Sequence, residues 1–237
     1  MGRAPKPKPT KIKASQIEVA AEIQERLPLW SNTDKALNAL NDRYRGFSLD
    51  ACLVKAAAVN ALYATYVLAI TKMAQHVYEV LGQKELSSIN AAEAICLVEE
   101  LAKLRLLPIE RDQEHQADEI ATQPRERRFR SFASKFCAFY VAAERFPIFD
   151  EAAREAIKLH LPAEEIDRAN DYGAFVRNVD AVRAWSGLHD VKYKEIDRYL
   201  WLRGMHQRYE KGDERVNAEL QYFFRQKPPE LSLLIGL

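Results

Sequence analysis

Apolar residues recur every three or four positions along most of the chain, which is the spacing of one face of an α-helix. The longest such pattern places apolar or aromatic side chains at positions 52, 56, 59, 63, 66, 70, 73, 77 and 81. Ser48 suits the start of this pattern as an N-cap, and Gly82 suits its end. Few segments alternate apolar and polar residues as a half-buried strand would. The pattern therefore predicts an all-α fold.

A single helix over residues 51–81 would exceed the usual length in a globular protein, so a break within it is expected. The polar segment NALYAT, residues 60–65, is the predicted place of this break. Ser15 and Glu18 have the spacing of a capping box at the start of another helix, which Pro28 would end. Further helices are predicted over residues 33–43, 90–104, 151–161, 163–185 (as two segments), 190–210 and 213–225.

Composition is that of an ordinary globular protein, with 48% hydrophobic and 29% charged residues in a chain of 237. The longest uncharged run, residues 56–71, is too short and too polar for a membrane span. No apolar signal region follows the N-terminus, so a cytoplasmic location is expected. Cys52, Cys96 and Cys137 lie far apart on apparent helix faces, which predicts buried, reduced thiols.

The net charge is only +1, but the basic residues are unevenly distributed. Residues 1–13, MGRAPKPKPTKIK, contain five basic side chains, three prolines and no acid. This composition predicts a disordered tail, which either contacts phosphate or is merely a solvated leader. Residues 110–124 are highly polar and are expected to form a surface connection.

Candidate chemistry is concentrated in residues 125–154, RERRFRSFASKFCAFYVAAERFPIFDEAAR. A turn-like SFAS leads to Lys135 on an apolar helix, and a proline-containing turn leads to Asp150, a good N-cap for the next helix. A lysine with a lowered pKa can act as a nucleophile, and a fixed carboxylate can stabilise a developing positive charge. The alternatives are a lysine that contacts phosphate or solvent and an aspartate that only caps a helix.

The order and spacing of Lys135 and Asp150 resemble the helix-hairpin-helix DNA glycosylase superfamily, in which a hairpin ending in a lysine opens a helix and a proline–aspartate pair follows. Residues 51–81 are similar to the family's helix pair that carries a polar segment into the DNA-facing cleft, and residues 194–204 are similar to a late core helix. The resemblance covers residues 48–204. SFAS lacks the two glycines usual in the hairpin, and the interval of fifteen residues from lysine to aspartate is a few residues shorter than usual.

The resemblance implies an enzyme that cleaves the N-glycosidic bond of a modified or damaged DNA base and needs no cofactor. Asp150 would stabilise the oxocarbenium-like sugar, and Lys135 would be the nucleophile of an additional lyase activity. The divergent hairpin suggests modified foreign or phage DNA as a substrate. The implied contacts to the DNA backbone are Arg125, Arg127, Arg128, Arg130, Ser131 and Ser134, and those to the base pocket or strand gap are Asn60, Tyr63 and Thr65.

For each of these groups a simpler interpretation is open. The arginines would then form a solvated face in which Glu126 pairs with part of the charge, Tyr63 would pack in the core, and Asn60 would bond a neighbouring backbone group. Two other functions also stay open: a non-catalytic DNA-binding or adaptor protein that retains the fold, and a helical protein–protein interaction module.

The resemblance further implies two helical lobes around a cleft. Residues 48–150 would form one lobe, and residues 14–47 and 151–237 the other, in a protein expected to be a monomer. The five histidines form no close pair with cysteine or acid at ligand spacing, so no metal site is predicted. Because no cysteine follows Cys137, the four-cysteine iron–sulfur cluster of some superfamily members is excluded.

Overall fold

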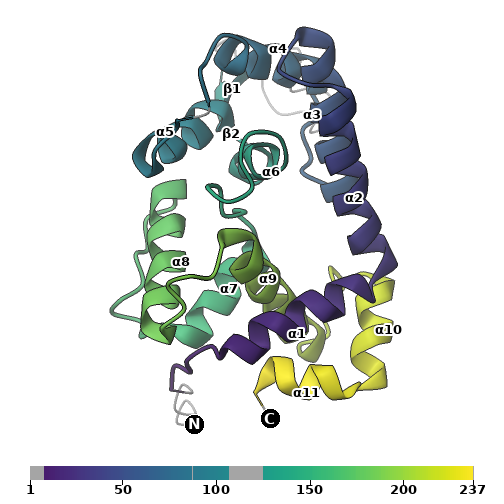
Figure 1. The fold of residues 1–237 in the computed structure, drawn as a ribbon, viewed down its shortest axis with the longest axis vertical. Helices are drawn as coiled ribbons and strands as arrows, with labels where there is room; N and C mark the ends of the chain where they lie inside the picture. Colours follow the sequence, from purple (N-terminus) through teal and green to yellow (C-terminus); the bar gives the residue numbers. More distant parts are fainter. Residues whose placement is uncertain (1–7, 87, 107–124, 237) are drawn as a thin grey trace, which may run out of the picture. The chain divides into compact units, whose positions relative to one another are not determined.

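The structure is a computed structural model that describes residues 8–86, 88–106 and 125–236 (Figure 1). Helices account for 66% of the chain and strands for 3%, so the prediction of an all-α fold is confirmed at the level of fold class. None of the helices in the described part of the chain is long and apolar enough to cross a membrane.

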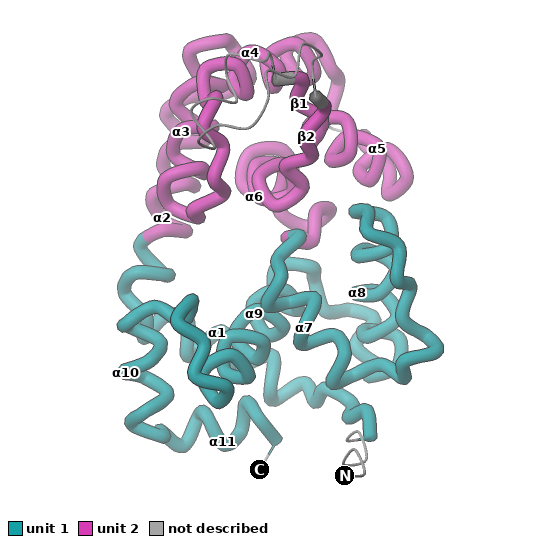
Figure 2. The backbone as a smooth tube through the Cα atoms, turned by 180° about the vertical axis from the view of Figure 1, so that it is seen from behind, with its two compact units in different colours: residues 1–32, 149–237 teal, residues 33–148 magenta. Residues whose placement is uncertain are grey.

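The chain forms two compact units (Figure 2). Unit 2 is the continuous segment 33–148, and unit 1 combines the residues up to 32 with residues 149–237. The sequence prediction placed the corresponding boundaries at 48 and 150. Lys135 thus belongs to unit 2 and Asp150 to unit 1, and Asp150 follows the boundary almost at once.

Unit 2 is built around helix α6, which packs against helices α3 and α5, while α4 packs against both α3 and α5. Two short antiparallel strands complete it, with Lys103 paired to Arg128 and Leu106 to Arg125. Its elements are the greater part of α2 (Pro28–Arg43), α3 (Leu49–Tyr63), α4 (Ile70–Leu81), α5 (Ala91–Ala102), β1 (Lys103–Leu106), β2 (Arg125–Arg128) and α6 (Arg130–Tyr140).

The long apolar pattern is divided between α3 and α4, and the predicted break is confirmed. Ser48 caps α3 as predicted, since its side chain accepts a hydrogen bond from the amide of Ala51. Tyr66 departs from the pattern, because it lies in the break with a left-handed φ of 55° and is 74% exposed. Val67 is buried in its place. The break resets the helical phase, so the two helices bury their own faces independently.

The prediction of a turn at SFAS is wrong, because residues 131–134 lie in the first turns of helix α6. Phe132 and Phe136 are buried one helical turn apart, and only a helix that starts before both can place them on one face. The arginine-rich segment before them forms strand β2, whose partner β1 takes up residues that were predicted as the end of a helix. The helix predicted to reach residue 104 therefore ends at Ala102, and the residues after it pair with a distant segment as a strand.

Unit 1 is centred on helix α9, which contacts α1, α7, α10 and α11, while α8 packs against α7 (Figure 1). Ile196, Leu200 and Met205 of α9 are buried, as the apolar stripe predicted. The helices of this unit are α1 (Ala14–Glu25), α7 (Glu151–His160), α8 (Tyr172–Ser186), α9 (Tyr193–Glu210), α10 (Ala218–Gln226) and α11 (Pro229–Ile235).

Three helix boundaries in this unit differ from prediction because of caps. Helix α1 begins at Ala14 and not after Ser15, since the amide of Lys13 donates to the side-chain oxygen of Gln16 at 2.9 Å. Pro28 opens α2 instead of only ending α1, which suits a residue without an amide hydrogen. Pro229 opens the unpredicted helix α11 in the same way.

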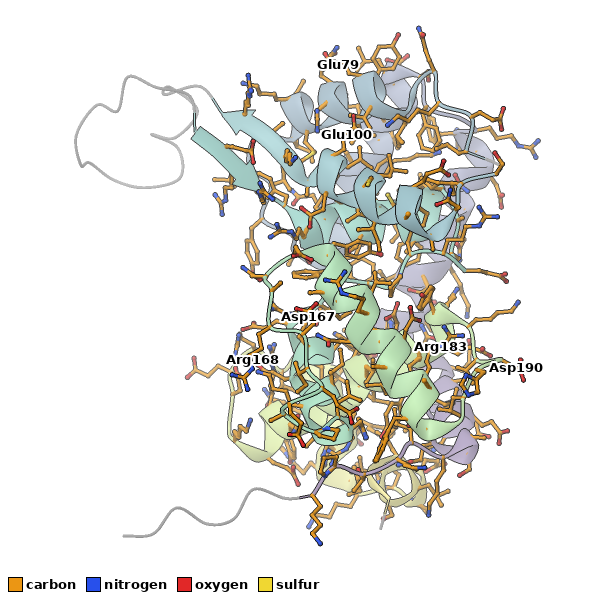
Figure 3. All side chains as sticks on the ribbon, turned by 90° about the vertical axis from the view of Figure 1, so that its left-hand side faces the viewer. Glu79, Glu100, Asp167, Arg168, Arg183 and Asp190 are labelled. Atoms are coloured by element: carbon orange, nitrogen blue, oxygen red, sulfur yellow. The ribbon has the colours of Figure 1, made fainter. Side chains whose placement is uncertain are left out.

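Residues 163–171 are not the predicted helical segment, and α8 is the one helix between residues 163 and 186. The side chain of Asn178 fixes this stretch from α8, because it accepts from the amide of Asp167 and donates to its carbonyl, both at 2.8 Å. Asp167 also pairs with Arg177 at 2.7 Å (Figure 3). Side-chain hydrogen bonds thus replace the helical ones that the sequence suggested.

Residues 8–13 are held against unit 1, which corrects the prediction of a disordered tail for this part of it; residues 1–7 lie outside the described part. The amide of Thr10 donates to the carbonyl of Leu159 at 2.9 Å, and Ile12 is buried. The thiol predictions hold for Cys52 and Cys137, which are buried and free, but Cys96 is exposed.

The buried imidazole of His160 makes the stability of unit 1 dependent on pH. His160 is 2% exposed, and its Nδ1 lies 2.7 Å from the carbonyl oxygen of Thr10. Burial lowers the pKa of His160 to about 4, although the hydrogen bond to Thr10 opposes the shift. Because this pKa lies below its ordinary value, the unfolded chain binds more protons between about pH 6.5 and pH 4.

Acidification through that window should therefore reduce the free energy of unfolding by up to about 3 kcal/mol. Urea unfolding at pH 7 and at pH 4.5 measures the loss, which should be smaller in His160→Gln. The variant His189→Gln, at an exposed histidine of the same unit, should keep the wild-type dependence. Equal losses in the wild type and in His160→Gln would contradict the assignment.

Candidate functional site

Asp150 is the N-cap of helix α7, as the sequence predicted. Its backbone is extended, and its Oδ1 accepts a hydrogen bond from the amide of Ala152 at 2.9 Å. The side chain is partly exposed. The carboxylate therefore bonds one of the amides that a helix N-terminus leaves without an intrahelical partner.

A close crossing of two helices fixes the backbone that carries Asp150. Gly204 of α9 lies so near the first turn of α7 that a Cβ atom added there would stand 2.0 Å from the carbonyl oxygen of Ala152. Ala152 is the residue that donates its amide to Asp150. The absence of a side chain at position 204 therefore sets the place of the carboxylate.

An ion-pair network joins the same two helices a turn further along. Arg208 of α9 is nearly buried and donates to both carboxylate oxygens of Glu155 at 3.0 Å, while Glu151 lies 3.0 Å from the same guanidinium. The hydrogen bond from Arg208 is the main cause that lowers the pKa of Glu155. Arg215 then pairs with Glu151 and with Asp213. A paired guanidinium at this crossing resists sliding of α7 along α9.

Aromatic side chains of α8 hold the residue before Asp150. The ring of Phe149 meets that of Phe175 edge to face at 5.3 Å and lies 6.5 Å from that of Tyr172. The guanidinium of Arg154 lies 4.9 Å from the Phe149 ring. Sequence reasoning missed this cluster, although the aromatic spacing at the start of α8 was visible. Asp150 is thus anchored from both α8 and α9.

Lys135 meets two other predicted site residues inside unit 2. It is 3% exposed, and its Nζ donates to Ser131 Oγ at 2.8 Å, one turn earlier on α6. The same nitrogen lies 5.4 Å from the centre of the Tyr63 ring, whose hydroxyl donates to Asp34 at 2.8 Å. Phe139 packs beside Tyr63 at 5.6 Å. The amine therefore lies inside unit 2, bonded to the Ser131 hydroxyl and beside aromatic rings.

Asn60 closes the break between α3 and α4. Its Oδ1 accepts from the Thr65 hydroxyl at 2.9 Å and from the Val67 amide at 2.8 Å, and its Nδ2 donates to the Val67 carbonyl at 3.0 Å. Ala64 and Tyr66 both have positive φ in this short segment. These contacts match the interpretation that Asn60 bonds neighbouring backbone groups, while a contact from Asn60 or Thr65 to a base stays a prediction.

The predicted phosphate-binding residues fall into two groups. Arg130 and Ser134 make internal contacts: Arg130 pairs with Glu99 at 2.6 Å, and the buried Ser134 hydroxyl donates to the Ser131 carbonyl at 3.3 Å. Arg127 and Arg128 are exposed on β2. Arg128 lies 3.2 Å from Glu126, the pairing that the sequence suggested. Of Arg125, the structure describes the backbone alone.

A second buried lysine was not foreseen. Lys55 is fully buried on α3, where its amine donates to Asn41 Oδ1 at 2.9 Å and to the Gly46 carbonyl at 3.0 Å. The rings of Phe47 and Tyr140 lie 4.8 and 5.0 Å from the nitrogen. Burial lowers the pKa of Lys55. Its position on the apolar face of the 52–81 pattern was the signal, and its role is to fix the turn between α2 and α3.

Within the described residues, no group of three or more histidine, cysteine, aspartate or glutamate side chains could hold a metal ion. A family model, HI_0787_N, described as an N-terminal domain, matches residues 13–144. Because the match covers more than half of the 237 residues, the chain belongs to this family. The matched region includes Tyr63 and Lys135 and ends before Asp150. No match was found among curated proteins or among solved structures.

Replacing Gly204 should displace the first turn of α7. Gly204→Ala places a methyl group against the Ala152 backbone, and we expect a loss of about 3 kcal/mol in the free energy of unfolding, as for an overpacked core. Gly212→Ala is the control, since its Cβ meets nothing within 4 Å and left-handed strain alone costs roughly 1 kcal/mol. Urea unfolding compares them; a smaller loss in Gly204→Ala than in Gly212→Ala would show that the helices can separate freely.

Proposed function

We propose that the protein is a DNA glycosylase-like enzyme of the helix-hairpin-helix kind, which cleaves the N-glycosidic bond of a modified or damaged base. The observation that carries the proposal is the way in which Asp150 is held in place. Its partly exposed carboxylate accepts a hydrogen bond from the Ala152 amide, and its backbone is anchored through α8 and α9. Such a group supports chemistry that develops positive charge, because its position is fixed before the reaction.

Cleavage of an N-glycosidic bond leaves positive charge on the sugar as the base departs with the bonding electrons. Asp150 would stabilise that charge and accept a proton from the attacking nucleophile, which is water in a simple hydrolase. The target base must leave the helical stack before it can be reached. Modified bases of foreign or phage DNA are included in the proposed substrate class.

Lys135 supports an additional lyase step. Its neutral amine would attack C1′ of the sugar, forming a carbon–nitrogen bond as the bond to the base breaks. The amine loses its proton to a base such as Asp150, and ring opening then gives a Schiff base. The Lys135 amine is 3% exposed inside unit 2, where it bonds Ser131 and lies 5.4 Å from the Tyr63 ring. The proposal requires that Lys135 and Asp150 reach the same nucleotide.

Asp150→Asn tests the catalytic carboxylate without removing the helix cap, because asparagine caps as well as aspartate. We expect base release from a panel of duplexes with modified bases to fall by at least about 100-fold, with stability nearly unchanged. Asp171→Asn is the matched control: it caps α8 by accepting from Ala174 at 2.7 Å and should release base at the wild-type rate. Undiminished release by Asp150→Asn would remove Asp150 from the mechanism.

Borohydride trapping tests the lyase step. The wild type incubated with its substrate duplex should give a covalent protein–DNA adduct on reduction, and Lys135→Gln should give none, although glutamine can still bond Ser131. Lys158→Gln, at an exposed lysine of α7, should trap as the wild type does. No adduct in the wild type, together with normal base release, would leave a simple hydrolase.

A further inference from the structure

The strand pair β1–β2 has one strongly basic face. In an antiparallel pair, residues directly opposite each other point to the same side. The register places Lys103 opposite Arg128 and Arg105 opposite Glu126, so these four side chains share one face. All four are exposed. Leu104, between the two basic residues of β1, is buried on the other face.

This arrangement does not stabilise the strand pair itself. Like charges directly opposite each other are unfavourable by a few tenths of a kcal/mol to about 1 kcal/mol, and Lys103 faces Arg128 in this way. Among the residues that the structure describes, neither Lys103 nor Arg105 forms an ion pair, whereas Arg128 lies 3.2 Å from Glu126 and 3.4 Å from Glu99. Lys103 and Arg105 are exposed, so an external anion can reach both side chains.

Arg130 increases the positive potential of the strand pair without facing a ligand. It binds Glu99 at 2.6 Å and is mostly buried, so it neutralises the carboxylate that also touches Arg128. The Glu99 carboxylate is thus shared between two guanidinium groups and balances only one of their charges. Arg130 thus acts on Arg128 through Glu99, which contacts both arginines.

We infer that the β1–β2 pair binds the phosphate backbone of duplex DNA through Lys103, Arg105 and Arg128. The inference rests on the proposed function only for the choice of duplex DNA as the anion. A strand of four residues spans roughly 13 Å at about 3.3 Å per residue. Duplex DNA carries one charge per ~1.7 Å of axis, so several phosphates fit along this length.

The strand pair also offers a way to contact phosphate that the start of helix α6 lacks. Residues 131–134 form helix, and the segment has no glycine whose amide could approach a phosphate closely. Extended strands with long basic side chains can grip a backbone without such an approach, because lysine and arginine reach the phosphates from a distance. The grip is independent of base sequence.

The test is binding of a labelled, unmodified duplex to the full chain, followed by fluorescence anisotropy at several salt concentrations. In the double variant Lys103→Gln/Arg105→Gln, the slope of log affinity against log salt should fall in magnitude by about 1.8, which is about 0.9 for each lost contact. The affinity at 0.1 M salt should fall by about tenfold or more. Lys158→Gln/Arg225→Gln makes the same charge change at exposed positions of unit 1 and should bind nearly as the wild type does.

Wild-type affinity and slope in the Lys103→Gln/Arg105→Gln variant would overturn the inference. So would an equal loss in the control, which would point to net charge alone.

A second measurement does not depend on a folded variant. Acetylation of surface lysines in the wild type, read by mass spectrometry, should show Lys103 protected at least several-fold when duplex is present and Lys158 unprotected. Equal acetylation of Lys103 with and without duplex would also overturn the inference.

The DNA-binding test of the β1–β2 pair can fail or succeed independently of the base-release test of the proposed function. If no substrate releases a base while the Lys103→Gln/Arg105→Gln variant loses affinity, the β1–β2 inference stands and the glycosylase proposal fails. If base release depends on Asp150 while that variant binds normally, the reverse holds.

Discussion

The close contact between Gly204 of α9 and Ala152 of α7 is the constraint on which unit 1 depends. A helix pair can approach this closely only where one side chain is absent, because any Cβ would overlap the opposing backbone. Helix α9 also packs against α1, α10 and α11, so the position of α7 is transmitted to most of the unit. Arg208 and Glu155 then fix the register of the crossing. The crossing of α7 and α9 therefore fixes the position of Asp150.

In unit 2, the half-buried Asn60 and the buried Lys55 hold the two ends of helix α3 through hydrogen bonds. Asn60 uses both its amide hydrogen-bonding ends on residues of the α3–α4 break, and Lys55 gives its amine to Asn41 and the Gly46 carbonyl. A buried polar group without such partners would cost several kcal/mol, so each network is stabilising only as a whole. Both groups close turns between helices, and in this way they set the ends of α3.

The two candidate catalytic side chains, Asp150 and Lys135, lie in contrasting environments. Asp150 stands at a helix N-terminus and accepts a backbone amide, whereas Lys135 lies within α6, where it donates to Ser131 beside the Tyr63 ring. The basic strand pair and Lys135 belong to unit 2, whereas Asp150 belongs to unit 1.

The amino-acid sequence by itself determined the helical class, the break in the 52–81 pattern, and the caps at Ser48 and Asp150, since these depend on contacts within a few residues of the chain. The meeting of Tyr63 with Lys135 could not be predicted, because α4, α5 and the strand pair separate α3 from α6 along the chain. Only the tertiary structure made strands of residues 103–106 and 125–128, gave Gly204 its role, and paired Arg130 with Glu99. Strand pairing, close helix crossings and ion pairs are formed between distant segments, and local periodicity contains no information on which distant segment will be the partner.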